Sequence, residues 1–393
     1  MKYTRIILSL LTLISLPLYA VAMQPKEIVD AIVNGNRTRL LSDKASAELY
    51  AARASNNFEG PEIDFEHLWA KDGSTKWAFG ISQNFEWPGD YSLRTKIAEQ
   101  QYTTARLNIR ATEIELRLQA TQLLIHCAAV QQRIDFLKST LADFRNIHNL
   151  LSEALQHGEA TILELTKTEI EIAQLTIQIG YLEDTLNDYI ADLNELAAEQ
   201  LNLTDTDWSA FPMMSQLCDK EYYIEQIKND PTLLALESER YAAALQLKQA
   251  KMSVLPGFGI GYRHEKEEGT HFNGFSVSLN LPTWNFNSSR KASLFNQQTA
   301  EIQTELTYRL YLARIESEYK SASTLRHNLS LLETDSLVDR YNAMLRDAFE
   351  GGELTIIDYL REKSYYTNVY LDKKDLEEKY LVLLASLNRY TAD

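Results

Sequence analysis

The sequence predicts a mainly α-helical protein with a small β part, built from one structural unit used twice. Two long stretches carry apolar residues at helical spacing, and four short segments alternate apolar with small or polar residues. The third observation is an internal repeat: GEATILEL at 158–165 returns as GELTIIDY at 352–359, an offset of 352 − 158 = 194 residues. The same offset aligns Gly80 with Gly274, Ser82 with Ser276, Pro88 with Pro282, Ala98 with Ala292, and Leu193-Asn194 with Leu387-Asn388. This ungapped register predicts two copies of one unit: strand, proline, long helix, glycine turn, helix.

Residues 1–22 have the features of an export signal. Lys2 and Arg5 form a positive n-region, residues 6–18 form an apolar h-region, and Ala20-Val21-Ala22 fits the small-residue cleavage rule. The alternative is a membrane anchor, but the apolar run is short for a span of about 20 residues. The residue directly after the cleavage site is not a cysteine, so we do not expect an N-terminal lipid anchor. We therefore expect an exported, processed chain.

Charge and cysteine content narrow the possible partners. The formal net charge is −16, and removal of the basic signal makes it more negative, which argues against binding to nucleic acid. Cys127 and Cys218 are the two cysteines. In an exported protein they could form a disulfide. Helix lengths put both near mid-height, but two free thiols remain an equal alternative.

The first repeat is expected over residues 23–199. Its parts are a half-length helix at 24–55, a β-hairpin at about 61–87, a long helix at about 91–157, a tip at 158–163 and a return helix at 161–199. The long helix contains neither proline nor glycine, and its length corresponds to roughly 100 Å at 1.5 Å per residue. Gly158 interrupts the helical pattern, so the chain is expected to turn back there.

The second repeat follows a polar mid-height loop at 200–220 and covers 221–393. Its parts are a half-length helix at 221–252 broken at Asp230-Pro231, a β-hairpin at about 256–281, a long helix at about 289–350, a tip at 351–357 and a return helix at 355–389. Two half-length helices add up to one long helix in each copy. We therefore expect a rod with the glycine turns at one end and the strands at the other.

The four strands have two unlike faces. One face is apolar or aromatic, and the other is small, glycine-rich or acidic, as in transmembrane β-strands of about 9–11 residues. Four strands cannot close a membrane barrel, for which about eight is the minimum, so the chain is expected to oligomerise. A trimer would supply twelve strands and a full ring of helices. Two soluble hairpins packed on helices are the alternative.

Acidic residues of the first strand alternate with its apolar ones. Glu62, Asp64 and Glu66 share the polar face and would line the lumen of a barrel. A ring of carboxylates there would favour cations. The alternative is a charged sheet face in water.

These features resemble the TolC family of outer-membrane efflux proteins over nearly all of the expected mature chain. The resemblance rests on a strand, Trp87-Pro88-Gly89, a very long helix and a Gly-x5-Glu/Asp turn, with the whole pattern repeated. Residues 85–89, FEWPG, and the strand end Leu281-Pro282 are most similar to its heavy-metal branch, the CzcC-like and CusC-like channels. The family fold is a long α-helical barrel of coiled-coil hairpins with four membrane β-strands per chain, closed as a trimer.

The resemblance implies a homotrimer in the outer-membrane lipid with a long periplasmic extension. It also implies a periplasmic adaptor and an inner-membrane pump of the resistance-nodulation-division class as partners. The tips that would contact the adaptor are Gly158, Glu159, Ala160 and Thr161, extending to Leu163, and Gly352, Glu353, Leu354 and Thr355, extending to Ile357. By position, Asp358 and Arg361 are gate candidates. Many members have a second acid where this chain has Arg361, which puts a double acidic ring in doubt.

No catalytic or cofactor motif is present, so we expect neither an enzyme nor a cofactor. His264 and His271 flank one turn and could bind a metal, although solvent-exposed histidines are the simpler interpretation. We expect a passive duct for heavy-metal cations, with drugs or a type I secretion system as alternative cargo. A soluble periplasmic coiled-coil adaptor or scaffold is the alternative of another class.

Overall fold

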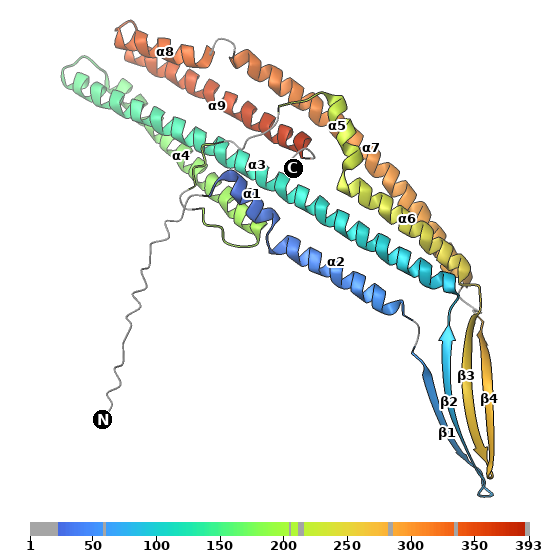
Figure 1. Ribbon diagram of the computed structural model, residues 1–393. Helices are drawn as coiled ribbons and strands as arrows, with labels where there is room; N and C mark the ends of the chain where they lie inside the picture. Colours follow the sequence, from blue (N-terminus) through green and yellow to red (C-terminus); the bar gives the residue numbers. More distant parts are fainter. Residues whose placement is uncertain are drawn as a thin grey trace, which may run out of the picture.

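The computed structural model describes residues 23–57, 60–203, 206–210, 216–281, 286–333 and 337–389. The proposed signal at 1–22 lies outside the described residues. The chain forms a long curved rod of helices that ends in a small antiparallel sheet, and the helical turns lie at the opposite end (Figure 1). Both the mainly helical fold and its four strands were predicted.

The elements follow the predicted order twice. In the first half they are α1 (Pro25–Val33), α2 (Asn36–Ser55), β1 (Glu62–Trp69), β2 (Thr75–Phe85), α3 (Pro88–Gln156) and α4 (Ile162–Ala197). In the second half they are α5 (Lys220–Gln226), a 3-10 turn (Ile227–Asn229), α6 (Pro231–Met252), β3 (Gly257–Glu267), β4 (Thr270–Asn280), α7 (Phe286–Glu333), α8 (Leu337–Glu350) and α9 (Ile356–Asn388). The long second helix expected at 289–350 corresponds to α7 and α8, and residues 334–336 between them lie outside the described residues.

One helix, α3, contacts α1, α2, α4, α6 and α9. The helix α3 has 69 residues and extends from the sheet to the tips. Beside the sheet the helices contact one another in the row α2–α3–α6–α7, and toward the tips in the row α4–α3–α9–α8, where α7 also contacts α9. The strands have the same order, β1-β2-β3-β4. Among the described helices, none has both the length and the hydrophobicity required of a membrane span.

The single helix predicted over 24–55 was wrong. The helix is interrupted at Asn34-Gly35. Asn34 ends α1, and Gly35 adopts an extended conformation (φ −68°, ψ −179°) before α2. A Cβ on Gly35 would lie 3.4 Å from the carbonyl oxygen of Ala197, so the bend is held close to the end of α4. Gly35 aligns at the 194-residue offset with Asn229, in the break between α5 and α6 that was predicted. The half-length helices of both copies are therefore bent at the same place.

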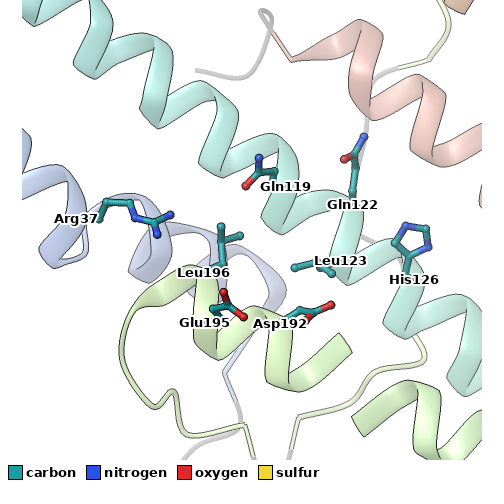
Figure 2. A pocket seen from close by; sticks show the side chains of 8 residues that line it. All are labelled: Arg37, Gln119, Gln122, Leu123, His126, Asp192, Glu195 and Leu196. Atoms are coloured by element: carbon teal, nitrogen blue, oxygen red, sulfur yellow. The ribbon is translucent and has the colours of Figure 1, made fainter. Parts of the chain in front are cut away.

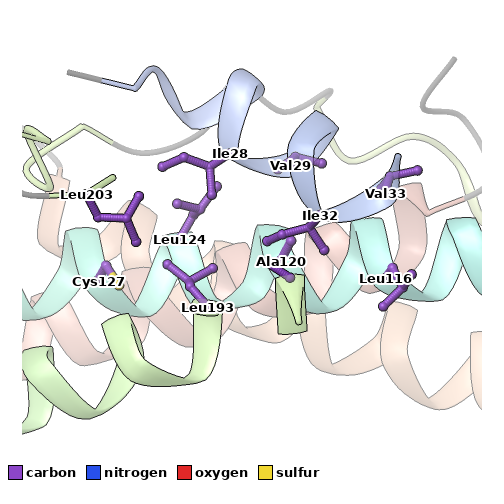
Figure 3. Close-up of a cluster of buried hydrophobic side chains, with 11 residues drawn as sticks. Ile28, Val29, Ile32, Val33, Leu116, Ala120, Leu124, Cys127, Leu193 and Leu203 are labelled. Atoms are coloured by element: carbon purple, nitrogen blue, oxygen red, sulfur yellow. The ribbon is translucent and has the colours of Figure 1, made fainter. Parts of the chain in front are cut away.

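A buried cluster fixes α1 near the middle of α3. Ile28 and Ile32 of α1 pack with Leu124 of α3 and Leu193 of α4 (Figure 3). Leu203, from the predicted mid-height loop, joins the same cluster. Burial of this apolar surface attaches the first half-length helix to the hairpin formed by α3 and α4.

Candidate functional site

Two left-handed glycines form the tips of the rod. Gly158 has φ +75° and Gly352 has φ +73°. After each glycine a backbone N–H closes the turn: Glu159 donates to the carbonyl of Ala154, and Glu353 to that of Ala348, both at 2.9 Å. Residues with a Cβ rarely adopt this conformation, so glycine is favoured at both turns. The two tips that were expected from the repeat are thus built in the same way.

The helices that leave the two tips are capped alike. Thr161 Oγ1 accepts a hydrogen bond from the backbone N–H of Glu164 at 3.3 Å, and Thr355 Oγ1 accepts one from that of Asp358 at 3.1 Å. The threonine hydroxyls in turn donate to the carboxylates of Glu164 (2.9 Å) and Asp358 (2.7 Å). Asp358 also accepts a hydrogen bond from Arg361 Nη2 at 2.8 Å. Thr355 therefore caps α9, and the Asp358 carboxylate holds the Thr355 hydroxyl and is paired with Arg361 of the same helix.

The tips differ in the apolar surface that they expose. In the first tip, Ile162 is 67% and Leu163 75% exposed. At the second tip Ile356 packs against a buried cluster, and Ile357 is only 37% exposed. The first tip therefore presents the larger apolar surface for contact with another protein.

A shared core joins the two helical hairpins near the tips. Its buried residues are Leu137, Leu141, Phe144, Ile147 and Leu151 of α3, Leu175 and Ile179 of α4, Leu345 of α8, and Tyr359 and Leu360 of α9. Farther from the tips, the rings of Phe136 and Tyr370 stack at 3.8 Å between centroids. The hairpins α3/α4 and α8/α9 therefore pack together as one body in this structure.

One buried lysine lies between the helices that form this core. Lys363 of α9 is 6% exposed, and its Nζ lies 3.1 Å from Asp143 Oδ2 on α3 and 3.3 Å from Asn342 Oδ1 on α8. The ammonium group also lies over the ring of Tyr366, 5.5 Å from its centroid. A lysine is rarely buried without such partners. No sequence pattern indicated the contact of Lys363 with Asp143, because the spacing of residues along one helix does not reveal which residue of another helix they meet.

The sheet has one apolar face, as predicted. Directly opposite residues on this face include Phe65 with Phe79, Ile81 with Tyr262, and Tyr262 with Phe275. The face is largely uncovered: Phe275 is 90% and Phe65 70% exposed. In this chain β1 and β4 are edge strands, each with one row of backbone groups free for another strand.

The polar face of the sheet carries basic as well as acidic side chains. Glu62, Asp64 and Glu66 do share it, but Glu66 Oε2 is paired with Arg263 Nη2 of β3 at 2.7 Å. Arg263 also contacts Glu265, which is in turn 2.9 Å from Lys76 Nζ of β2. Arg263 thus neutralises part of the acidic charge of this face, and that these carboxylates line a lumen stays a prediction. The pair itself depends on the pairing of β2 with β3, which is not visible in either hairpin alone.

Cys127 and Cys218 are free thiols in the structure. Cys127 is buried beside Leu124 and Leu193, whereas Cys218 packs against a different cluster around Tyr223. The disulfide that the sequence left open is thus not formed here.

A polar depression lies between α2, α3 and α4 (Figure 2). Arg37 comes from α2, Gln119 and His126 from α3, and Asp192 and Glu195 from α4. Within the described ranges, no three His, Cys, Asp or Glu residues are grouped so that they could hold a metal ion.

The overall arrangement is that of the TolC-family outer-membrane channels. The Campylobacter jejuni CmeC outer-membrane channel superposes with a TM-score of 0.77 at 14% identity, over 93% of this chain and 85% of that one. The Vibrio cholerae outer-membrane protein VceC gives 0.75 at 13% identity (93% and 95%), and CusC, which forms a transmembrane channel, gives 0.69 at 16% (94% and 92%). No protein-family model and no curated protein sequence matches the chain. At these identities the likeness defines the fold.

Proposed function

We propose that the protein is the outer-membrane duct of a tripartite efflux pump and works as a homotrimer with no reaction of its own. The observation that carries this proposal is that the chain has the geometry of one sector of a tube. Four elements stand in a row at three levels: in the sheet, beside the sheet and toward the tips. At each level two elements of the first repeat are followed by the two corresponding elements of the second repeat. The elements β1, α2 and α4 form one edge of this sector, and β4, α7 and α8 form the other.

Each edge has exposed surface suited to a neighbouring copy. Along α4 the side chains of Leu163, Ile170, Ile177 and Tyr181 are exposed and follow helical spacing, opposite the face that packs on α3. The free edges of β1 and β4 would pair in an antiparallel or parallel ladder with another strand. Contact between the first edge of one copy and the last edge of the next is heterologous, and such contacts generate closed rings.

Three copies account for the sheet. Four strands are too few for a membrane barrel, whereas twelve strands lie within the usual range. The apolar face, with Phe275 and Val277 more than three-quarters exposed, would then contact lipid. The polar face would line the lumen. This arrangement supports an outer-membrane location with the helices extending into the periplasm.

The tips are the proposed docking and gating end. Ile162 and Leu163 supply an apolar surface for a periplasmic adaptor, and the adaptor would connect the duct to an inner-membrane pump. Opening would require the α8/α9 hairpin to move relative to α3/α4. The contact between Asp143 and Lys363 opposes that movement. Asp358 and Arg361 stay the proposed gate residues, and their own ion pair lies within α9.

Cations are the cargo that the polar face favours. It carries five acidic side chains, Glu62, Asp64, Glu66, Glu265 and Glu267, against the two basic residues Lys76 and Arg263. An excess of carboxylates along a pore attracts cations. This supports heavy-metal ions as cargo, ahead of drugs or proteins of a type I system, although the pump would make the final selection.

The proposal is tested by extraction and conductance. The full-length protein should sediment with outer membranes after carbonate washing and give a trimer mass in detergent. The trimers should then produce ion currents in planar bilayers. A monomer in the periplasmic fraction would instead support the soluble scaffold, and a trimer without any current would contradict the duct.

A further inference from the structure

The described strands carry three lysine or arginine residues, Lys76, Arg263 and Lys266, which differ in their acidic partners. On the polar face, Lys76 and Arg263 are both paired with Glu265, and Arg263 also with Glu66. Lys266 is on the opposite, apolar face, because it pairs directly with Trp77 of β2 and His271 of β4. No acidic side chain in the described part of the chain forms an ion pair with Lys266. A cation therefore stands on the apolar face without a counter-charge.

Polar rings surround this cation. His67, Trp77, Lys266 and His271 form one row across all four strands. In the adjacent row, His264 lies with its Nε2 3.4 Å from His271 Nδ1 and its Nδ1 2.6 Å from Asn273 Oδ1. The two histidines alone offer a metal ion only two ligands, and no third His, Cys, Asp or Glu among the described residues completes a site.

The row lies where a membrane interface is expected. Phe258 is at the helical end of the apolar face, and Lys266 is 266 − 258 = 8 residues farther along β3, which is about 26 Å at 3.3 Å per residue. The apolar band of membrane barrels is about 25 Å tall and bordered by aromatic girdles. Trp77 belongs to the row, and Trp69, which is 76% exposed, lies two residues beyond its His67, as the aromatic residues of such a girdle would. Lys266 would thus stand at the level of the lipid headgroups.

We propose that Lys266, with His264 and His271 beside it, binds the phosphate of an anionic lipid headgroup at the end of the sheet that carries the turns. The Lys266 ammonium group is the donor that matches phosphate oxygens, whereas both ring nitrogens of His264 are already engaged, by Asn273 and by His271. The aromatic rings beside them cover the adjoining part of the acyl chain. This inference rests on the proposed insertion of the sheet in a membrane.

The experiment compares lipids by tryptophan quenching. The purified full-length trimer is reconstituted in phosphatidylcholine mixed with phosphatidylglycerol, and either lipid carries brominated acyl chains. Wild type should bind the anionic lipid more tightly, and Lys266→Gln should reduce this preference by about fivefold, the effect of one basic residue at an anionic surface. High salt should weaken the preference of the wild type.

Lys76→Gln is the matched control, because it removes the same charge from the polar face of the neighbouring strand. It should leave the lipid preference unchanged. Equal ratios for Lys266→Gln and wild type, or an equal loss in Lys76→Gln, would overturn the inference. So would inorganic phosphate that abolishes the preference at constant ionic strength, since the site would then bind the free anion. Quenching by neither brominated lipid would instead mean that the sheet is not in the bilayer, and the proposed duct itself would fail.

Discussion

Lys363 of α9 and Asp143 of α3 connect the two helical hairpins, with 3.1 Å between ammonium nitrogen and carboxylate oxygen. The lysine is almost fully buried, whereas the Asp143 side chain is 44% exposed. The pair is therefore worth less than a fully buried one, and we take about 1 kcal/mol for it. In the proposed duct this contact helps to hold the tip end closed.

Asp143→Asn is expected to favour the open state. Loss of about 1 kcal/mol should raise the conductance of trimers in planar bilayers by about fivefold, if the closed state predominates in wild type. Asp135→Asn is the matched control, because Asp135 also lies on α3 but, among the described residues, accepts a hydrogen bond only from Gln131 of the same helix. A conductance that rises equally in both variants would show that the inter-hairpin contact has no special role.

The repeat supplies a control for the gate candidate Asp358. Asp358→Ala and Glu164→Ala each remove the carboxylate that accepts a hydrogen bond from the capping threonine, at a cost of about 1 kcal/mol or less. If Asp358 also restrains the gate, only Asp358→Ala should raise the conductance of the trimer. Identical currents in wild type and both variants would leave Asp358 with a role in its own helix end alone.

The tip glycines should be costly to replace. A Cβ at Gly158 or Gly352 would meet no atom within 4 Å, so the cost of alanine arises from the positive φ alone. We expect about 1 kcal/mol for each substitution, and less for asparagine, which tolerates this conformation better. Hydrogen exchange of the Glu159 and Glu353 amides measures it directly. Protection that is unchanged in Gly158→Ala would contradict the turn described here.

The two thiols should react differently. Burial raises the pKa of Cys127 to about 12, so this thiol stays protonated at neutral pH and should resist maleimide. Cys218 is partly exposed and should be labelled. One label per folded chain, rising to two after denaturation, is the expected mass spectrum. Labelling of neither residue until a reductant is added would indicate a disulfide.

The same shift gives a pH dependence of stability. The folded state keeps the Cys127 proton above pH 9, where the unfolded chain begins to lose it. The free energy of unfolding should therefore fall between about pH 9 and pH 12. Cys127→Ala should reduce this slope, which thermal melting over that range would detect.

Local patterns predicted the elements of the fold, and the repeat predicted their order. Alternation found all four strands, and the offset of 194 residues paired Gly158 with Gly352. The break at Gly35 was missed, although the same offset aligns it with the predicted break before Pro231. That alignment was the available signal, since a glycine within a polar helix does not by itself require a bend.

Contacts between distant segments could not be predicted. The pair of Glu66 with Arg263 depends on the register between β2 and β3, which come from different repeats. The pair of Asp143 with Lys363 depends on which faces of α3 and α9 meet. Both are set by packing of the whole chain, so no local periodicity encodes them.

The most direct test of the account is cross-linking between the two edges of the sector. Ile170 of α4 lies 170 − 158 = 12 residues after Gly158, and Arg340 of α8 lies 352 − 340 = 12 residues before Gly352. Both are exposed and stand about 18 Å from their tips. In a closed ring, Ile170 of one copy lies beside Arg340 of the next copy. Two copies of Ile170, or two copies of Arg340, stay apart.

We would therefore treat Ile170→Cys/Arg340→Cys, in a Cys218→Ser background, with a flexible bismaleimide, alongside each single-cysteine variant. A ring of three sectors predicts covalent dimers and trimers, and nothing larger, from the double variant, and monomers from both single variants. Cross-linking of Ile170→Cys alone would indicate a twofold dimer. That result, or a double variant that remains monomeric while both cysteines react, would contradict the ring of three sectors.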